Sequence, residues 1–154
     1  MRRQLILGGL SLVARSAAAA AQVGSAADEV VAANAVFDAA LSRRDLSSLE
    51  ALCLREDGVT AAHPRDRSPT VGWAAVRRSW EETFARFSEL SVAMPEPRAQ
   101  VFGDMAIVVG LENIRGRRAS DGVTVTFDAM TTNVFQRGAG RWLLVHHHAT
   151  MLVT

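Results

Sequence analysis

The sequence predicts an α+β fold, a conical barrel in which three N-terminal helices pack on a strongly curved, mostly antiparallel sheet. Two observations carry this prediction. Apolar residues recur every three or four positions up to about residue 87, and they alternate with polar residues from residue 90 onward. Three of the alternating stretches are ten residues or longer, which is enough for strands to curl around a helix. Helices first and antiparallel strands last are typical of an α+β domain.

Three helices are expected before the sheet. The first spans residues 27–42 and carries its apolar residues at helical spacing, namely Val30, Ala33, Phe37 and Leu41. Asp45 is placed to cap the second helix, which carries Leu46, Leu49 and Leu52. The third helix presents one apolar face, made of Trp73, Val76, Trp80, Phe84 and Phe87. Each of these faces must be buried against the sheet or against another helix.

A short strand is expected between the second and third helices, over residues 59–62. His63 and Pro64 end it, because Pro64 lacks the N–H that a ladder needs and holds His63 extended. Residues 65–70 are expected to form a loop. The later strands are expected at residues 90–94, 98–102, 105–115, 123–136 and 141–153, with a turn over residues 116–122.

Residues 1–21 are typical of a signal peptide. Arg2 and Arg3 provide a basic start, an apolar stretch follows at residues 5–13, and small residues at 17–21 suit cleavage. The adjacent arginines resemble a twin-arginine signal, although no Ser or Thr precedes them, so the Sec route stays open. A frayed amphipathic N-terminus is the alternative. We therefore expect export to the periplasm or beyond, with no stable membrane anchor after cleavage.

The composition excludes several functions. The chain has no Lys for Schiff-base chemistry and no Tyr for a phenolic donor, and Cys53 is its single cysteine. All 17 basic residues are Arg, scattered among 16 acids at a net charge of +1, so no basic stripe for nucleic acid is present. Removal of residues 1–21 would change this net charge to −2. Histidines, carboxylates, Asn, Ser, Thr and Trp remain for chemistry.

The last strand is apolar on both faces. Strand alternation places one set of side chains together, namely Trp142, Leu144, His146 and His148, and the other set opposite, namely Leu143, Val145, His147 and Ala149. A strand buried on both faces needs a cover on the outside of the sheet. A second copy of the chain is the simplest cover, so we expect a homodimer.

Six short motifs follow one another in a fixed order. They are Val59–Pro64, Gly72 with Val76 and Ser79-Trp80-Glu81 up to Phe84, Gly103-Asp104, Val109–Asn113, Thr132–Phe135, and Trp142 with Val145–Thr150. In this order and spacing the chain resembles the SnoaL-like branch of the nuclear transport factor two-like superfamily, over a domain at residues 27–152. The resemblance implies a cone with a pocket between sheet and helices, and often a dimer. The superfamily includes polyketide cyclases, ketosteroid isomerases, epoxide hydrolases, dehydratases and many members without a known activity.

The ketosteroid isomerase branch allows a residue-by-residue comparison. His63 falls where that branch has its carboxylate base, and an imidazole can act as a base near neutral pH. Phe37 falls where that branch has a Tyr, and Thr132 falls where it has an Asp. The oxyanion hole would then be largely lost, which removes about 3 kcal/mol of stabilisation per donor. The resemblance therefore argues against steroid isomerisation.

The histidines are the main candidates for a site. His146 and His148 are expected to point together into the cone, where His63 would close the set from the neighbouring strand. Three interpretations stay open: a polar pocket wall hydrogen-bonded to Asn133 and Glu112, an acid–base pair, or a zinc-class metal site. The preferred function is binding of a small hydrophobic or aromatic molecule, with neither metal nor cofactor. The alternative is a cofactor-independent lyase, isomerase or hydrolase, with His63 and His148 as base and acid and Asn133 polarising a carbonyl.

Three further residues are candidates for ligand contacts, and each has a structural alternative. Trp80 lies on the apolar helical face, where it is a core residue or presents an edge to the ligand. Glu112 is a pocket carboxylate that orients a histidine, or it marks the point where its strand emerges into solvent. Asn133 holds a ligand carbonyl or satisfies a buried backbone group.

Overall fold

The computed structural model describes residues 24–153. Its elements are α1 (Ala26–Arg43), α2 (Leu46–Leu52), β1 (Thr60–Ala62), β2 (Thr70–Val71), α3 (Trp73–Ala85), β3 (Phe87–Ala93), β4 (Arg98–Phe102), β5 (Met105–Arg118), β6 (Thr124–Gly138) and β7 (Arg141–Met151). The expected signal peptide at residues 1–21 lies outside the described residues. None of the helices within residues 24–153 combines the length and the apolar character that a membrane span requires.

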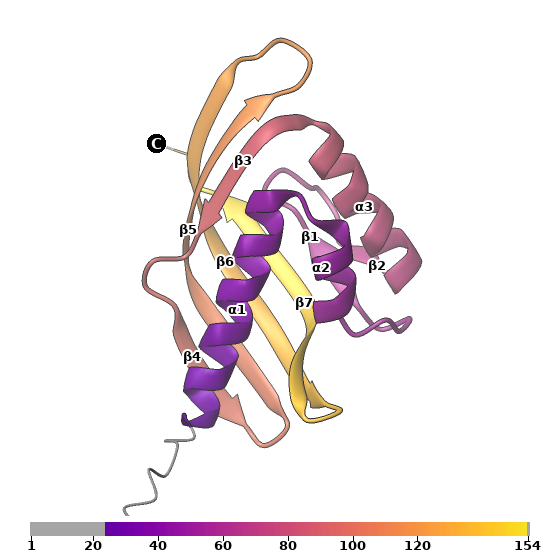
Figure 1. The fold of residues 1–154 in the computed structure, drawn as a ribbon, viewed down its shortest axis with the longest axis vertical. Coiled ribbons are helices and arrows are strands. Elements are labelled where there is room, and N and C mark those ends of the chain that lie inside the picture. Colours follow the sequence, from indigo (N-terminus) through magenta and orange to yellow (C-terminus); the bar gives the residue numbers. More distant parts are fainter. Residues whose placement is uncertain (1–23, 154) are drawn as a thin grey trace, which may run out of the picture.

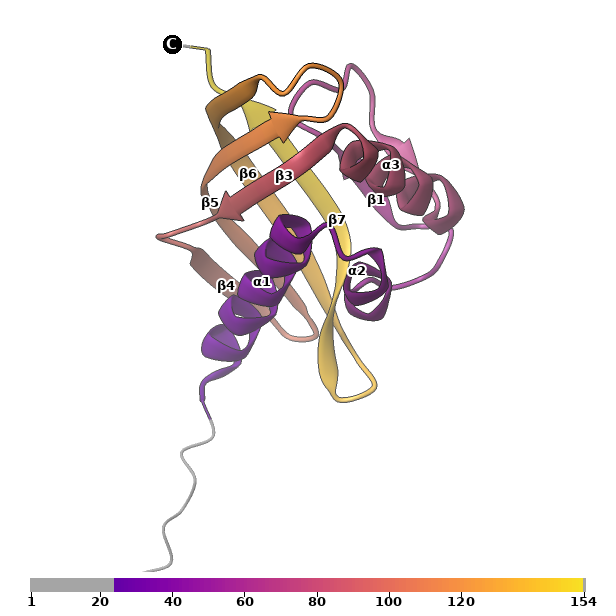
Figure 2. The ribbon, with the colours of Figure 1, turned by 45° about the horizontal axis from the view of Figure 1, so that its top comes forward.

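The strands form one curved sheet, and the helices lie on its concave side (Figures 1 and 2). The strand order is β2-β1-β7-β6-β5-β3, and β4 pairs with β5 beyond the end of β3. The pairing of β1 with β7 is parallel, and the other pairings are antiparallel. The predicted α+β fold with three helices on a mostly antiparallel sheet is confirmed. The sheet stays open, however, so the molecule is a cone rather than a closed barrel.

The helix ends follow from local sequence signals. Ser25 caps α1 by accepting a hydrogen bond from the N–H of Asp28, whose carboxylate accepts from the N–H of Ser25 in return. Arg44 ends the helix in the left-handed conformation, at φ 53°. Asp45 caps α2 through the N–H of Ser48, as the sequence predicts.

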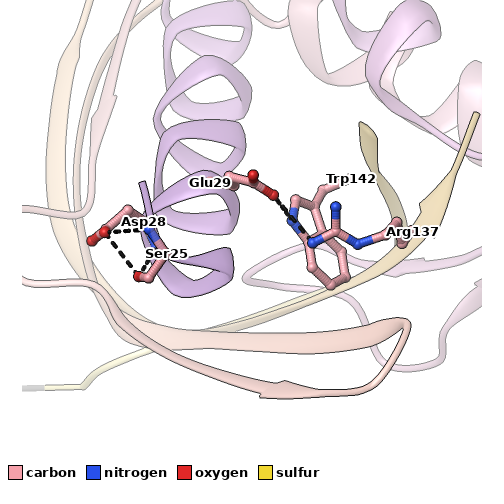
Figure 3. Close-up of polar contacts among 5 residues, drawn as sticks. All are labelled: Ser25, Asp28, Glu29, Arg137 and Trp142. Carbon is pink, nitrogen blue, oxygen red and sulfur yellow. Dashed lines mark hydrogen bonds and ion pairs between the residues drawn. The ribbon is translucent and has the colours of Figure 1, made fainter. Parts of the chain in front are cut away.

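The N-terminal half of α1 is fixed to the β6–β7 hairpin by one carboxylate (Figure 3). Glu29 Oε2 accepts hydrogen bonds from Arg137 Nη2 at 3.1 Å and from Trp142 Nε1 at 3.3 Å. The Arg137 guanidinium also lies over the Trp142 ring, 4.4 Å from its centroid. These contacts hold the helix across the concave side of the sheet.

Two expected boundaries are wrong, and both errors concern Phe87. The third helix ends at Ala85, and Phe87 begins β3 instead of continuing the helical face. β5 continues through Gly116, where a turn was expected, up to Arg118. An added Cβ at Gly116 would lie 2.6 Å from the Phe87 ring, so this glycine makes room for the ring to pack on β5. The two-residue strand β2 was also missed, because residues 65–70 read as loop.

Candidate functional site

A group of polar side chains lies on the concave face of the sheet. Strand pairing places Glu112 of β5, Thr131 and Asn133 of β6 and His147 of β7 on the same side as the apolar core. Each of the four is at most 3% exposed. Polar groups so deeply buried require hydrogen-bond partners, a shared proton or a ligand. The interior of the cone therefore contains a group of polar side chains within its apolar core.

A β-bulge decides which histidine of β7 points inward. Phe135 pairs with Leu144 and Val134 pairs with His146, so Val145 has no partner on β6. One extra residue shifts the alternation of side chains from that point onward. His147 and Ala149 consequently share the concave face with Trp142 and Leu144.

The predicted orientation of His146 and His148 is therefore wrong. His146 lies on the convex face, half-buried, with its Nδ1 2.6 Å from Thr60 Oγ1. His148 lies beside it, exposed, with its Nε2 3.2 Å from Thr150 Oγ1. His63 does not join these two histidines, and it lies near His147 instead, with 6.2 Å between the ring centroids.

Two asparagines fix the ring of His147. Asn133 Nδ2 donates to Asn34 Oδ1 at 2.8 Å, and Asn133 Oδ1 lies 2.8 Å from His147 Nδ1. Because an amide oxygen only accepts, His147 Nδ1 must carry the proton, which leaves Nε2 with a free lone pair in the neutral ring. Burial, followed by the nearby His63, holds the pKa of His147 well below its usual value. His147 is thus neutral at physiological pH, with a defined tautomer.

His63 is fixed in the same manner by Ser79. The Ser79 hydroxyl donates to the Val76 carbonyl at 2.7 Å, so it accepts from His63 Nε2 at 2.9 Å. The free lone pair of a neutral His63 is then on Nδ1. Burial lowers the pKa of His63, and the charge of Arg86 lowers it further, whereas Asp66 opposes both.

Trp80 joins the two histidines. Its ring meets His63 edge to face at 4.3 Å between centroids and lies 5.2 Å from the ring of His147. Phe37 of α1 completes the cluster, 5.7 Å from Trp80 and 5.2 Å from His147. Trp80 is 4% exposed and belongs to the core, in agreement with the structural alternative considered from the sequence.

A buried pair of carboxyl groups lies beside this cluster. Asp38 of α1 accepts from the Met94 N–H through Oδ2, but its Oδ1 has no partner. Burial raises the pKa of Asp38 to about 6. Burial, followed by the charge of Asp38, raises the pKa of Glu112 to about 7, against a weaker effect of the Thr131 hydroxyl. Glu112 is 1% exposed, so the alternative in which its strand emerges into solvent there is excluded.

A cavity of about 530 Å³ opens where α3, the loop after β1 and the β5–β6 hairpin meet. Phe87, Val125 and Phe127 supply its apolar wall, and His63 connects it to the buried aromatic cluster. This volume lies within the range of small-molecule sites in proteins. A second hollow, of about 620 Å³, lies over Val109, Leu111 and Met130 on the convex side.

The structure thus separates the predicted site residues into two groups. His63, Trp80, Asn133 and Glu112 lie inside the cone, whereas His146 and His148 lie outside it. Four further residues of the interior were not predicted from the sequence, namely His147, Asn34, Asp38 and Thr131. Asn34 and Asp38 had a signal, since they are four residues apart on the buried stripe of α1. Within residues 24–153, no three His, Cys, Asp or Glu side chains converge in a way that could hold a metal ion.

This arrangement supports two activities, ligand binding and proton transfer. The apolar cavity can bind a small molecule, and the neutral imidazole of His63 at its edge can accept a proton or a hydrogen bond. His147, Asp38 and Glu112 do not line this cavity, and all three are buried.

Comparison with known proteins agrees with this architecture. A family model described as a SnoaL-like domain matches residues 30–154. No curated protein matches the chain. A solved dehydratase candidate of the nuclear transport factor two-like family from Streptomyces avermitilis is 27% identical, with a TM-score of 0.75, over 82% of this chain and 96% of that chain.

Two further solved structures show the same fold. A candidate association domain of calcium/calmodulin-dependent protein kinase type II from Thiobacillus denitrificans is 30% identical, over 80% of this chain and 94% of that chain, with a TM-score of 0.63. A ketosteroid isomerase-like protein from Erwinia carotovora atroseptica is 16% identical, over 85% of this chain and 99% of that chain, with a TM-score of 0.72.

Proposed function

The chain belongs to the SnoaL-like domain family, and on this premise we propose that it binds a small hydrophobic or aromatic molecule in the cavity at the end of the cone. The cavity itself carries the proposal. Its wall of Phe87, Val125 and Phe127 offers apolar surface, and His63 offers one hydrogen-bonding group beside it. A concave apolar site with a few placed polar groups is the usual form of a ligand pocket.

A large side chain that fills this cavity should weaken ligand binding strongly. We expect Val125→Trp to weaken binding of the neutral probe 2-naphthamide at least about tenfold, because the indole would occupy the space that the probe needs. The neighbouring Thr124→Trp should bind as the wild type does, because strand alternation places Thr124 on the other face. Isothermal titration calorimetry measures both affinities, with circular dichroism to check folding.

A second variant keeps the test decisive if Val125→Trp fails to fold. Ala85→Trp fills the cavity from the exposed end of α3, where a large side chain leaves the sheet undisturbed. Unchanged affinity in both folded variants, or no binding of naphthamide to the wild type, contradicts the proposed function.

A cofactor-independent lyase, isomerase or hydrolase is the second candidate. The observation in its favour is the pair of a half-buried His63 and a buried His147, each with one lone pair left free by a fixed partner. The Streptomyces neighbour, a dehydratase candidate, agrees with this class. In this candidate, His147 takes the role of acid–base partner of His63 that the sequence suggested for His148, because the rings of His63 and His147 lie 6.2 Å apart between centroids. In a substrate screen, His63→Gln separates the candidates, because an enzyme loses turnover and keeps its affinity for the substrate.

We propose in addition that the convex face pairs with a second copy of the chain. Val109, Leu111 and Met130 are 39%, 46% and 61% exposed there, and neighbouring exposed apolar side chains on one face can mark an interaction surface. Glu96 and Arg98 both line the hollow over this face, so a twofold arrangement can set one against the other. The Thiobacillus neighbour is itself described as an association domain. Sedimentation equilibrium that shows only monomer at micromolar concentration contradicts this proposal.

Export remains a prediction from residues 1–21. Cleavage after Ala21 would leave every residue of the described structure in the mature chain, including the Ser25 cap of α1.

A further inference from the structure

The rim of the cavity at the end of the cone is positively charged. Arg65, Arg86 and Arg118 line it, and Asp66 is the only acid among the described residues that does so. Arg118 is occupied by Asp121, to which it donates two hydrogen bonds of 3.0 and 2.6 Å. Arg65 and Arg86 form no ion pair within residues 24–153. Two guanidinium groups at the mouth of an apolar cavity are therefore available to a ligand.

The backbone at Arg65 is held by a tight turn. The N–H of Asp66 donates to the His63 carbonyl at 2.9 Å, and the Asp66 carboxylate accepts from the His63 N–H at 2.9 Å. Arg65 lies inside this turn, two residues after His63, which joins the cavity to the aromatic cluster. The same contact occupies one carboxylate oxygen of Asp66.

The backbone at Arg86 is held between α3 and the β5–β6 hairpin. Its N–H donates to the Thr83 carbonyl at 3.1 Å, and its carbonyl accepts from the N–H of Ala119 at 2.9 Å. The hairpin, the end of α3 and the loop after β1 gather at the same end of the molecule in both views (Figures 1 and 2). The two arginines thus start from fixed points on different segments of one rim.

The charge at this rim reaches into the cavity. Arg86 is close enough to contribute to the lowered pKa of His63, which keeps that ring neutral at physiological pH. The positive charge at the mouth is therefore carried by the arginines, and the wall behind them is apolar. Arginine forks match carboxylates in a bidentate geometry, and a cleft of one sign concentrates the opposite ion.

We propose that the ligand of this cavity is a small amphipathic carboxylic acid, whose apolar body lies against Phe87, Val125 and Phe127 and whose carboxylate is held by Arg65 and Arg86. This inference rests on the proposed binding function and names its ligand class. The apolar wall provides affinity for the body of the molecule, and the two guanidinium groups select acids over neutral analogues of the same shape.

The test compares two probes of nearly equal shape, 2-naphthoate and 2-naphthamide, by calorimetric titration at pH 7.5. We expect naphthoate to bind about tenfold more tightly at low salt, and we expect this advantage to shrink as salt screens the rim. Arg86→Gln and Arg65→Gln should each weaken naphthoate binding about five- to tenfold and leave naphthamide binding unchanged. Arg78→Gln, which removes an exposed arginine of α3 outside the cavity, should change neither affinity.

The outcomes distinguish this inference from the function on which it rests. Equal affinity for both probes, or equal loss for both probes in the Arg86→Gln variant, overturns charge selection and leaves the binding function in place. If Arg78→Gln reduces the preference for naphthoate as much as Arg86→Gln does, the preference is a general charge effect, and the assigned site is overturned. Binding of neither probe to the folded wild type overturns both the inference and the binding function.

Discussion

Replacement of Glu112 by Gln is expected to stabilise the protein above pH 7 and to remove most of a stability loss that the wild type shows as the pH rises. Burial raises the pKa of Glu112 in the folded state from 4.5 to about 7. The protonated carboxyl is therefore favoured by folding, and its stabilisation is complete below pH 4.5 and lost as the pH rises through 7. For a shift of this size, the loss is about 3 kcal/mol.

Other titrating groups shape the wild-type curve, so the informative quantity is the difference between variant and wild type at each pH. Asp38, with a pKa raised to about 6, acts in the same direction as Glu112. His63 and His147 act in the opposite direction, because their lowered pKa values make the folded state lose stability as the pH falls below 6.5. Glu112→Gln leaves these histidines in place, so their contribution cancels in the difference.

Urea unfolding between pH 5 and pH 8 measures this difference. The free energy of unfolding of Glu112→Gln, relative to the wild type, should rise by about 2.5 kcal/mol across that range, because part of the full loss already occurs below pH 5. Glu89→Gln, at an exposed position of β3, is the matched control and should follow the wild type. A constant difference between Glu112→Gln and the wild type at every pH would mean that Glu112 ionises as freely in the folded chain as in the unfolded one.

Most of the fold could be predicted from the sequence because its signals are local. Helical spacing, the Asp45 cap and the stop at Pro64 each act within a few residues, and each prediction is confirmed. The boundary at Phe87 could not be predicted in this way. Phe84 and Phe87 are three residues apart, which suits a helix, but the Phe87 ring packs over Gly116 of β5, almost thirty residues further along the chain.

The orientation of the histidines could not be predicted for a similar reason. Strict alternation along β7 is a local rule, and it places His146 and His148 beside Trp142. The bulge at Val145 depends on how β7 pairs with β6, and it reverses the orientation of every later side chain. A run of three histidines gives no internal sign of which one is buried. Only the pairing selects His147.

The carboxyl pair shows the same limit. Asp38 and Glu112 lie on α1 and β5, and their proximity is a product of the way the helix crosses the concave side of the sheet. Asp38 has a signal in its place on the buried stripe of α1, and Glu112 has one in its apolar strand, but neither signal pairs one residue with the other. The fold turns two such residues into a buried group that titrates near neutral pH.

Trp80→Ala is expected to cost about 4 kcal/mol of the free energy of unfolding, the usual loss when a buried large aromatic residue is truncated. Trp80 is 4% exposed, and its ring packs against Phe37, His63, Phe84 and His147. Its removal leaves a cavity between α1, α3 and the sheet, and it removes a ring contact from both His63 and His147. Urea unfolding at constant pH measures the loss.

Trp80→Phe separates the packing role of this residue from a role in the site. A phenyl ring keeps most of the contacts, so we expect a smaller loss, about 1–2 kcal/mol. Because Trp80 does not line the cavity, the variant should bind 2-naphthamide within about twofold of the wild type. A loss of affinity of tenfold or more in a stable Trp80→Phe protein would instead place the ligand against the indole. The site would then extend from the apolar wall inward to His147, and the buried polar cluster would belong to the site itself rather than to its support.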